Sequence, residues 1–432
     1  MNEPLWDMRM KGHHQAVAPL RRLPGEAMSL GECDARGGLS GKDRRKCIYI
    51  HVPFCSRICS FCNMRRSNMI PPERYGILVA KQIERLGKHP YIQSGTYEAV
   101  YFGGGTPTTL GAEQLGIILR ALRNHLDIAP DAEISVETSV TDLTDDKLAV
   151  LRGEGVNRLS MGIQTFADQG RKTLGRRNTG ETVARRISDI VRGGLSNVNI
   201  DLIYNYPGQT DAELELDIAR VRELDIAGLS YYSLMIARNS ILGKKLGMDD
   251  DAYARRTFAV DHSRWTRIYD ALCREGFETL ELTKLVRPGR DEYRYIRIRH
   301  GNGDTLPIGA GAGGRIGAFV VGMPVDPDAY EALLEMPPEE GYRGRMVGAA
   351  YDDIYRQIGK LQLGYLDSEG MPEAAGTTFS KIASFIESNG LGCLDNGRIA
   401  LNRDGLFWGN NIAHWYADRL VGQAGEIWGG ME

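Results

Sequence analysis

The chain has 432 residues, 42% of them hydrophobic, so it is long enough for a large core and for more than one domain. Its 53 basic and 56 acidic residues leave a formal net charge of −3, which excludes a global field for nucleic acid or for an anionic membrane surface. No apolar run has the length of a membrane span and the N-terminus lacks a signal-peptide core, so we expect a cytoplasmic protein without membrane insertion. The seven cysteines fit a reducing compartment better than a disulfide scaffold.

Hydrophobic patterns divide the chain into four regions. Residues 1–45 are rich in Gly, Arg and Pro without a sustained period, which indicates an arm or a lid. Residues 46–236 alternate short β-rich runs with amphipathic stretches, and such β-α units predict an α/β fold with a parallel sheet and outer helices. We expect residues 237–345 to be an accessory region that completes the substrate cavity, and residues 346–432 to be a small helical or winged-helix domain. The expected strands of the second region cover residues 47–52, 99–102, 134–137, 158–163, 198–204 and 229–234.

Three cysteines share one short loop after the first of these strands: Cys55, Cys59 and Cys62. Their spacing allows three thiolates to hold three corners of an iron-sulfur cube, which leaves one iron open. An open iron can bind the amino and carboxylate groups of S-adenosylmethionine (SAM) and reduce its sulfonium. A zinc knuckle or buried cysteines are the alternatives, but zinc would need a fourth protein ligand, for which His51 is the nearest residue. The other four cysteines are scattered singly: Cys33, Cys47, Cys273 and Cys393.

Glycine-rich and polar motifs follow the ends of the other expected strands. They are YFGGGTPT at residues 101–108, RLSMGIQTF at 158–166, NIDLIY at 199–204 and PGQT at 207–210. Ligands of a β/α barrel sit at the carboxyl ends of its strands, so these motifs predict one site. The glycines have no Cβ, which would let their backbone approach a ligand closely.

In this order, the motifs resemble the radical SAM superfamily and, within it, the oxygen-independent coproporphyrinogen dehydrogenase-like branch. The resemblance extends from about Cys47 to Met235 and more weakly to the C-terminus. It implies an open six-unit β/α barrel with an extra α+β region. It also implies a 4Fe-4S cluster on Cys55, Cys59 and Cys62, with SAM bound at its open iron.

The resemblance implies further roles for named residues. Tyr49 would reach the methionyl end of SAM as a fourth catalytic residue, and Gly103, Gly104 and Gly105 would approach its amino group. The ribose and carboxylate contacts would come from Glu137, Gln164, Arg176 and Asp201. A second SAM would lie beside the first, against Phe61, Gly105, Thr106 and Ile203.

Two departures from that branch bear on the activity. The coproporphyrinogen enzymes have a further cysteine two residues after the third cluster cysteine, where this chain has Met64 after Asn63. Their Tyr-Gly-Leu-Pro turn is replaced by residues 204–207, Tyr-Asn-Tyr-Pro. The first difference counts against porphyrinogen decarboxylation, and the second predicts a different pocket wall.

Several activities fit the resemblance. Residues 292–295 and the glycine-rich run 307–317 resemble most the anaerobic heme-degrading methyltransferases, of the anaerobilin synthase type. That resemblance implies a methyltransferase that opens heme to a methylated linear tetrapyrrole and releases iron. The alternatives are a C-methyltransferase or cyclopropanase acting on an aromatic heterocycle of a natural product, an oxygen-independent coproporphyrinogen III dehydrogenase, and a non-catalytic heme chaperone.

The implied partners are heme or a related tetrapyrrole, an electron donor such as flavodoxin or ferredoxin, and no nucleic acid. Four arginines of a basic segment would pair the heme propionates, or else form a solvated face: Arg290, Arg294, Arg297 and Arg299. His300 would be an axial ligand of heme, or else a structural histidine.

Overall fold

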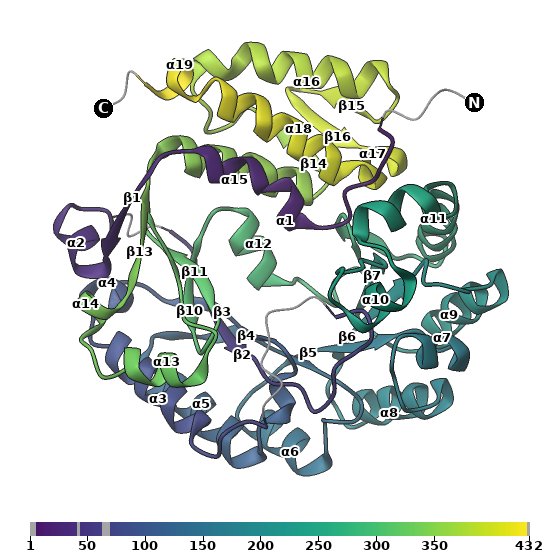
Figure 1. Ribbon diagram of the computed structural model, residues 1–432, viewed down its shortest axis with the longest axis horizontal. Helices are drawn as coiled ribbons and strands as arrows, with labels where there is room; N and C mark the ends of the chain where they lie inside the picture. The colour runs from purple at the N-terminus through teal and green to yellow at the C-terminus, as the bar shows by residue number, and fades with distance from the viewer. Residues whose placement is uncertain (1–5, 41–43, 63–69, 430–432) are drawn as a thin grey trace.

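The protein is described by a computed structural model that covers residues 6–40, 44–62 and 70–429 (Figure 1). Its centre is a parallel sheet whose strands are neighbours in chain order. This confirms the expected α/β fold, and every strand expected between residues 47 and 234 is present. The strands are β2 (Lys46–Val52), β3 (Tyr97–Gly104), β4 (Ile128–Thr138), β5 (Arg158–Gln164), β6 (Asn197–Tyr204) and β7 (Gly228–Ser233).

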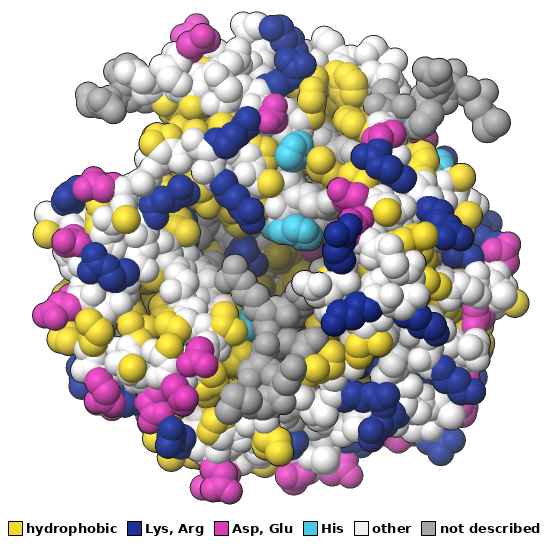
Figure 2. Space-filling view, viewed as in Figure 1, with side chains coloured by type: hydrophobic (Ala, Val, Ile, Leu, Met, Phe, Trp, Pro, Cys, Tyr) yellow, Lys and Arg dark blue, Asp and Glu magenta, His cyan; other side chains and the backbone are white. Residues whose placement is uncertain are grey.

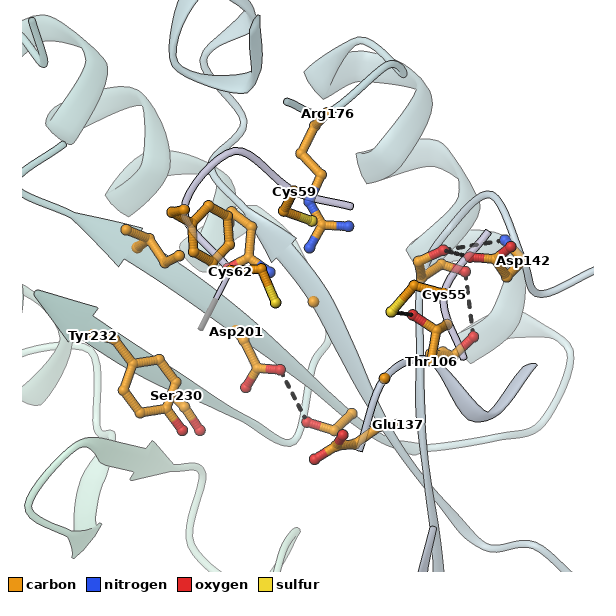
Figure 3. A pocket seen from close by; sticks show the side chains of 18 of the residues that line it. Cys55, Cys59, Cys62, Thr106, Glu137, Asp142, Arg176, Asp201, Ser230 and Tyr232 are labelled. Carbon is orange, nitrogen blue, oxygen red and sulfur yellow. Dashed lines mark hydrogen bonds between the residues drawn. The ribbon is translucent and has the colours of Figure 1, made fainter. Parts of the chain in front are cut away.

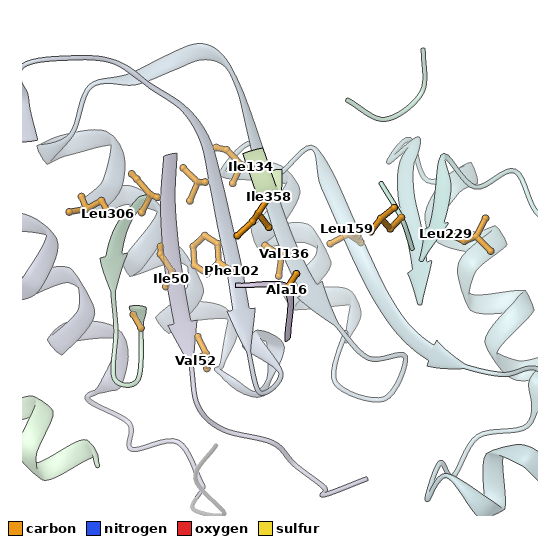
Figure 4. Packing of buried hydrophobic residues seen from close by; sticks show 14 of the residues in the cluster. Ala16, Ile50, Val52, Phe102, Ile134, Val136, Leu159, Leu229, Leu306 and Ile358 are labelled. Atoms are coloured by element: carbon orange, nitrogen blue, oxygen red, sulfur yellow. The ribbon is translucent and has the colours of Figure 1, made fainter. Parts of the chain in front are cut away.

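Apolar side chains on both faces bury these strands. In β2 every residue except Tyr49 is buried, as expected for a strand covered on each side. Figure 4 shows Ile50, Phe102, Val136 and Leu159 side by side on neighbouring strands. Helices cover the outer face (Figure 1): α3 (Tyr75–Leu86), α5 (Ala112–His125), α6 (Asp145–Gly153), α7 (Asp168–Thr173), α8 (Gly180–Arg192) and α9 (Asp211–Glu223).

Strands from distant parts of the chain extend the barrel sheet at both edges. At one edge β10 (Asp304–Ile308) is parallel to β2, and antiparallel strands follow it: β11 (Gly313–Ile316), β12 (Phe319–Gly322), β13 (Arg343–Val347) and β1 (Gly25–Ser29). At the other edge β9 (Lys284–Val286) and β8 (Glu278–Glu281) follow β7. Within the described residues, the sheet therefore has 13 strands and includes both the N-terminal segment and the accessory region.

The C-terminal part packs on the top of the barrel in Figure 1. It combines a three-stranded antiparallel sheet with helices. The elements are α15 (Ala349–Gln362), β14 (Tyr365–Asp367), α16 (Gly376–Ser388), β15 (Gly392–Asp395), β16 (Arg398–Leu401), α17 (Arg403–Phe407), α18 (Gly409–Gly422) and α19 (Ala424–Trp428). The N-terminal helix α1 (His13–Ala16) packs against α18.

The remaining helices connect these parts: α2 (Leu30–Ala35), α4 (Pro90–Gln93), α10 (Ile241–Leu246), α11 (Asp250–Cys273), α12 (Arg294–His300), α13 (Pro327–Leu333) and α14 (Pro338–Gly341). Among the described residues, none of the helices combines the length and the apolar character that crossing a bilayer requires.

Candidate functional site

A cavity of about 590 Å³ lies at the carboxyl ends of the barrel strands. Cys55, Cys59 and Cys62 line it together with residues from β3 to β7, as Figure 3 shows. The cavity volume falls in the range of small-molecule and cofactor sites. The site expected from the motifs is therefore one connected space, and the three sulfurs border it.

Backbone hydrogen bonds hold the cysteine loop against its neighbours. The amide of Ser60 donates to the carbonyl of Leu174 (3.3 Å), and the carbonyl of Ser60 accepts from the amide of Leu242 (2.7 Å). On the other side, the amide of Thr106 donates to the carbonyl of Phe54 (2.8 Å). The loop thus touches the end of α7, the start of α10 and the turn after β3.

Gly105 permits the closest of these approaches. A Cβ at this position would lie 2.3 Å from the carbonyl oxygen of Phe54 and 3.0 Å from the sulfur of Cys55. The first distance is shorter than any real side-chain contact, so another residue would displace the cysteine loop. The hydroxyl of the next residue, Thr106, lies 3.8 Å from the same sulfur.

Two partly buried carboxyl groups, Glu137 and Asp201, face the cavity from β4 and β6 (Figure 3). Burial raises the pKa of Glu137 to about 7, although the hydroxyl of Tyr101 donates to its Oε1 at 2.7 Å and opposes that shift. Burial also raises the pKa of Asp201, against the lowering effect of Lys284 and Arg158. Both groups are placed to accept hydrogen bonds from a ligand's hydroxyl groups.

Gln164 and Arg176 line the same cavity. Gln164 has a φ of 71°, a left-handed conformation that is uncommon outside glycine, at an irregularity in the pairing of β5 with β6. Arg176 extends toward the cavity beside Cys59 and Cys62 in Figure 3, and its buried Nε has no hydrogen-bond partner within the described structure. An unpaired guanidinium at this position suits a ligand carboxylate.

Most of the site residues expected from the sequence border this cavity. They are Cys55, Cys59, Phe61, Cys62, Gly104, Gly105, Thr106, Glu137, Gln164, Arg176, Asp201 and Ile203. Tyr49 and Gly103 do not: the hydroxyl of Tyr49 lies 2.8 Å from Nδ1 of His51, and Gly103 packs between Tyr49, Tyr101 and Glu137. Met64, with Asn63 before it, lies outside the described residues.

A buried charge cluster at the base of the cavity was missed by the sequence analysis. Arg158 makes a two-pronged ion pair with Asp291, at 2.9 and 3.0 Å, and Lys284 lies 3.4 Å from the same carboxylate. The ring of Tyr293 lies under the Arg158 guanidinium at 4.1 Å. Arg158, Lys284 and Tyr293 line the cavity. Lys284, a cation directly before the apolar residues Leu285 and Val286, was the sequence signal for this cluster.

The basic segment that follows the cluster turns away from the cavity. Arg290 pairs with Asp225, Arg294 with Asp131 and Glu292, while Arg297 donates to the carbonyl of Glu292 and Arg299 to Tyr295. His300 is 2% exposed, and its Nε2 lies 3.2 Å from Glu281. None of these residues lines the 590 Å³ cavity.

Comparison with known proteins identifies the group. The radical SAM superfamily model matches residues 49–221. The heme chaperone HemW of Lactococcus lactis is 31% identical over 268 residues, which cover 62% of this chain and 68% of that protein. This chain belongs to the radical SAM superfamily. Anaerobilin synthase of Escherichia coli O157:H7 is 30% identical over 278 residues, which cover 64% of this chain and 62% of that enzyme, less than two thirds of its length.

The fold of this radical SAM protein agrees with a solved structure. Coproporphyrinogen III oxidase (HemN) from Escherichia coli superposes with a TM-score of 0.71 over 89% of this chain and 92% of that one, at 21% identity. The likeness extends beyond the barrel, which confirms the expected architecture.

The site fits the cofactors of the superfamily, a 4Fe-4S cluster and SAM. Cys55, Cys59 and Cys62 line one cavity and would hold three irons of a 4Fe-4S cluster, whose open iron would be the position for SAM. Arg176, whose Nε has no hydrogen-bond partner in the described structure, complements the carboxylate of SAM. The carboxyl groups of Glu137 and Asp201 complement the hydroxyl groups of its ribose.

Proposed function

We propose that this radical SAM enzyme transfers a SAM-derived methyl carbon to heme under anaerobic conditions, opens the macrocycle to a methylated linear tetrapyrrole and releases its iron. The observation that carries the methyl transfer is the second group of residues in the cavity. Phe61, Gly105, Thr106 and Ile203 all line the space that the cluster cysteines border, where a second SAM would lie. The similarity to anaerobilin synthase supports heme as the substrate.

The chain would bind and orient the cofactors in this mechanism. Cys55, Cys59 and Cys62 would hold the cluster, which when reduced supplies the electron that cleaves SAM. Arg176 would pair the SAM carboxylate, and Glu137 and Asp201 would accept from its ribose hydroxyls. Tyr101 fixes the Glu137 carboxyl by its hydrogen bond. Because the reacting partners must be held close and away from water, this is positioning chemistry rather than acid-base chemistry.

Anaerobic incubation of the reconstituted enzyme with dithionite, SAM and hemin, followed by mass analysis, tests the proposal. SAM with a deuterated methyl group should yield deuterated 5′-deoxyadenosine and a linear tetrapyrrole that has gained the methyl-derived carbon. Protiated 5′-deoxyadenosine with hydrogen taken from the substrate would instead indicate a dehydrogenase. Absence of SAM cleavage would favour the chaperone.

Thr106→Glu tests the place of the second SAM. The carboxylate would occupy space beside Cys55 without removing a thiolate, because the Thr106 hydroxyl lies 3.8 Å from that sulfur. We expect methyl transfer to fall at least tenfold while cluster content stays near the native value. An assembled cluster with a native rate of methyl transfer would contradict this placement.

The non-catalytic heme chaperone is the second candidate, favoured by the similarity to HemW at 31% identity. The two functions differ in whether hemin is consumed. A chaperone would bind hemin with a stable absorption spectrum in the presence of dithionite and SAM. The proposed enzyme would bleach the spectrum as the macrocycle opens.

A further inference from the structure

The outer side of the cysteine loop has a basic surface. Five cationic side chains make up this surface, which we call the basic rim: Arg57, Lys172, Arg177, Lys244 and Lys245. All five are exposed, and within the described structure none has a carboxylate at ion-pair distance. In Figure 2, Lys and Arg side chains lie beside the central opening on the side where Figure 1 places α7 and α10.

The backbone connects the basic rim directly to the cluster ligands. Arg57 lies between Cys55 and Cys59, and both Arg57 and Arg177 border the mouth of the cavity. Lys172 lies at the end of α7, next to Thr173, whose carbonyl accepts from the hydroxyl of Ser60 at 2.8 Å. Lys244 and Lys245 lie on α10, which the amide of Leu242 ties to the carbonyl of Ser60. The rim therefore lies on the cysteine loop itself and on segments that are hydrogen-bonded to it or line the same cavity.

Two nearby acids, Asp168 and Asp249, have partners outside the rim. The carboxylate of Asp168 accepts from the amide of Gly180 at 2.8 Å. Asp249 caps the start of α11 and pairs with Arg238 at 3.1 Å. The rim also contains an apolar side chain, Ile241, which is 59% exposed at the start of α10. Exposed charge around an apolar contact is the pattern of a protein-binding surface.

We propose that the basic rim is the docking surface for a small acidic protein that carries a low-potential one-electron centre. One electron would pass from that centre to the cluster, so the partner is oxidised by one electron and the cluster is reduced by one, with no bond made or broken. The cluster must be reduced before it can cleave SAM, so an electron donor outside this chain is needed. The docking surface depends on the cluster assigned above and not on the identity of the substrate.

The experiment measures reduction of the cluster in the full-length holoenzyme, without SAM or substrate. A bacterial flavodoxin in its hydroquinone form is the probe, and bleaching of the visible cluster absorption gives the rate. Lys172→Glu/Lys244→Glu changes the rim charge by −4. Lys381→Glu/Arg343→Glu, on α16 and β13, is the matched control with the same change of charge far from the loop. Photoreduced deazaflavin, an uncharged small reductant, shows whether each cluster is still reducible.

We expect the rim variant to lose at least about tenfold in rate with flavodoxin at low salt, because opposite charges steer association. The control should stay within twofold, and deazaflavin should reduce all three proteins alike. Salt should slow the native protein more than the rim variant. An equal rate for the rim variant, or an equal loss in the control, would overturn the proposal. DNA binding that the rim variant loses, with unchanged electron transfer, would assign the rim to nucleic acid and overturn it as well.

The same experiment separates this inference from the proposed function. If flavodoxin reduces the native cluster quickly and hemin is not opened, the docking surface stands and heme degradation fails. If hemin is opened with deazaflavin as the reductant, and flavodoxin reduces the rim variant at the native rate, heme degradation stands and the docking surface fails. A milder variant, Lys172→Gln/Lys244→Gln, keeps the test decisive if the charge reversal does not fold.

Discussion

At the scale of single residues, the cysteine loop gives the first prediction. Replacing Cys55, Cys59 or Cys62 by Ala should abolish the broad visible absorption of the cluster and all SAM cleavage, because a cube with two protein ligands loses its irons. The controls are Ser replacements of Cys33, Cys47, Cys273 and Cys393, none of which lines the cavity. Iron content and the visible spectrum measure both sets. A full cluster in the triple Ala variant would contradict the ligand assignment.

Glu137 predicts a pH dependence of SAM binding. Its pKa is raised by burial to about 7, so at pH 6 most of the population is protonated and at pH 8 most is ionised. If the carboxylate accepts from the ribose hydroxyls, SAM affinity should rise with pH and be about tenfold weaker at pH 6 than the limit at high pH. Equilibrium dialysis of the holoprotein measures this. Glu137→Gln cannot titrate and should flatten the profile; an unchanged slope in that variant would assign the titration to another group.

Residue patterns predicted most of the residues that line the cavity at the strand ends, but not the charge cluster of Arg158, Lys284 and Asp291. The cysteines and Glu137 stand out because their chemistry is unusual at those positions. Asp291 stands in a polar loop and Arg158 at the start of an apolar strand, and nothing local shows that they form an ion pair buried to 0% and 1% side-chain exposure. Only the tertiary fold makes a buried charge tolerable there, because it supplies the partner.

At the scale of elements, the turn after β3 gives a prediction with a matched control. Gly105→Ala should displace the cysteine loop, since the new Cβ would lie 2.3 Å from the carbonyl oxygen of Phe54. Gly111→Ala adds the same methyl group a few residues later, where nothing lies within 4 Å. We expect Gly105→Ala to lose most of its cluster and Gly111→Ala to keep it, as measured by iron per chain. Equal cluster content in both variants would show that the turn adapts.

The barrel strands could be predicted from sequence, and the strands at the sheet edges could not. The strands β2 to β7 have runs of buried apolar residues separated by amphipathic helices, a local pattern. In contrast, β1 has three exposed and two buried residues in a segment rich in Gly and Arg, and its partner β13 lies more than 300 residues away. The pairing of β1 with β13 depends on where the folded sheet leaves an edge strand without a neighbour, which no local sequence pattern shows.

At the scale of the whole molecule, the N-terminal segment connects the barrel to the C-terminal helices. Arg9 is 4% exposed, and its Nε donates to the carbonyl of Phe407 at 2.9 Å while its Nη1 donates to the hydroxyl of Tyr204 at 2.7 Å. Its Nη1 also lies 3.6 Å from the buried Asp261. One guanidinium therefore contacts β6, α11 and the end of α17, three parts that the chain order keeps far apart.

Replacing Arg9 should therefore weaken the attachment of the C-terminal part. Arg9→Met keeps most of the packing volume but leaves the Asp261 carboxylate buried without its cation, which should cost about 3 kcal/mol in the free energy of unfolding. Adding Asp261→Asn removes the unpaired charge, so the double variant should recover part of that loss. Urea unfolding followed by tryptophan fluorescence is a suitable measurement, because Trp265 lies beside this guanidinium at 5.8 Å. If the single and double variants were equally unstable, the loss would come from packing rather than from the ion pair.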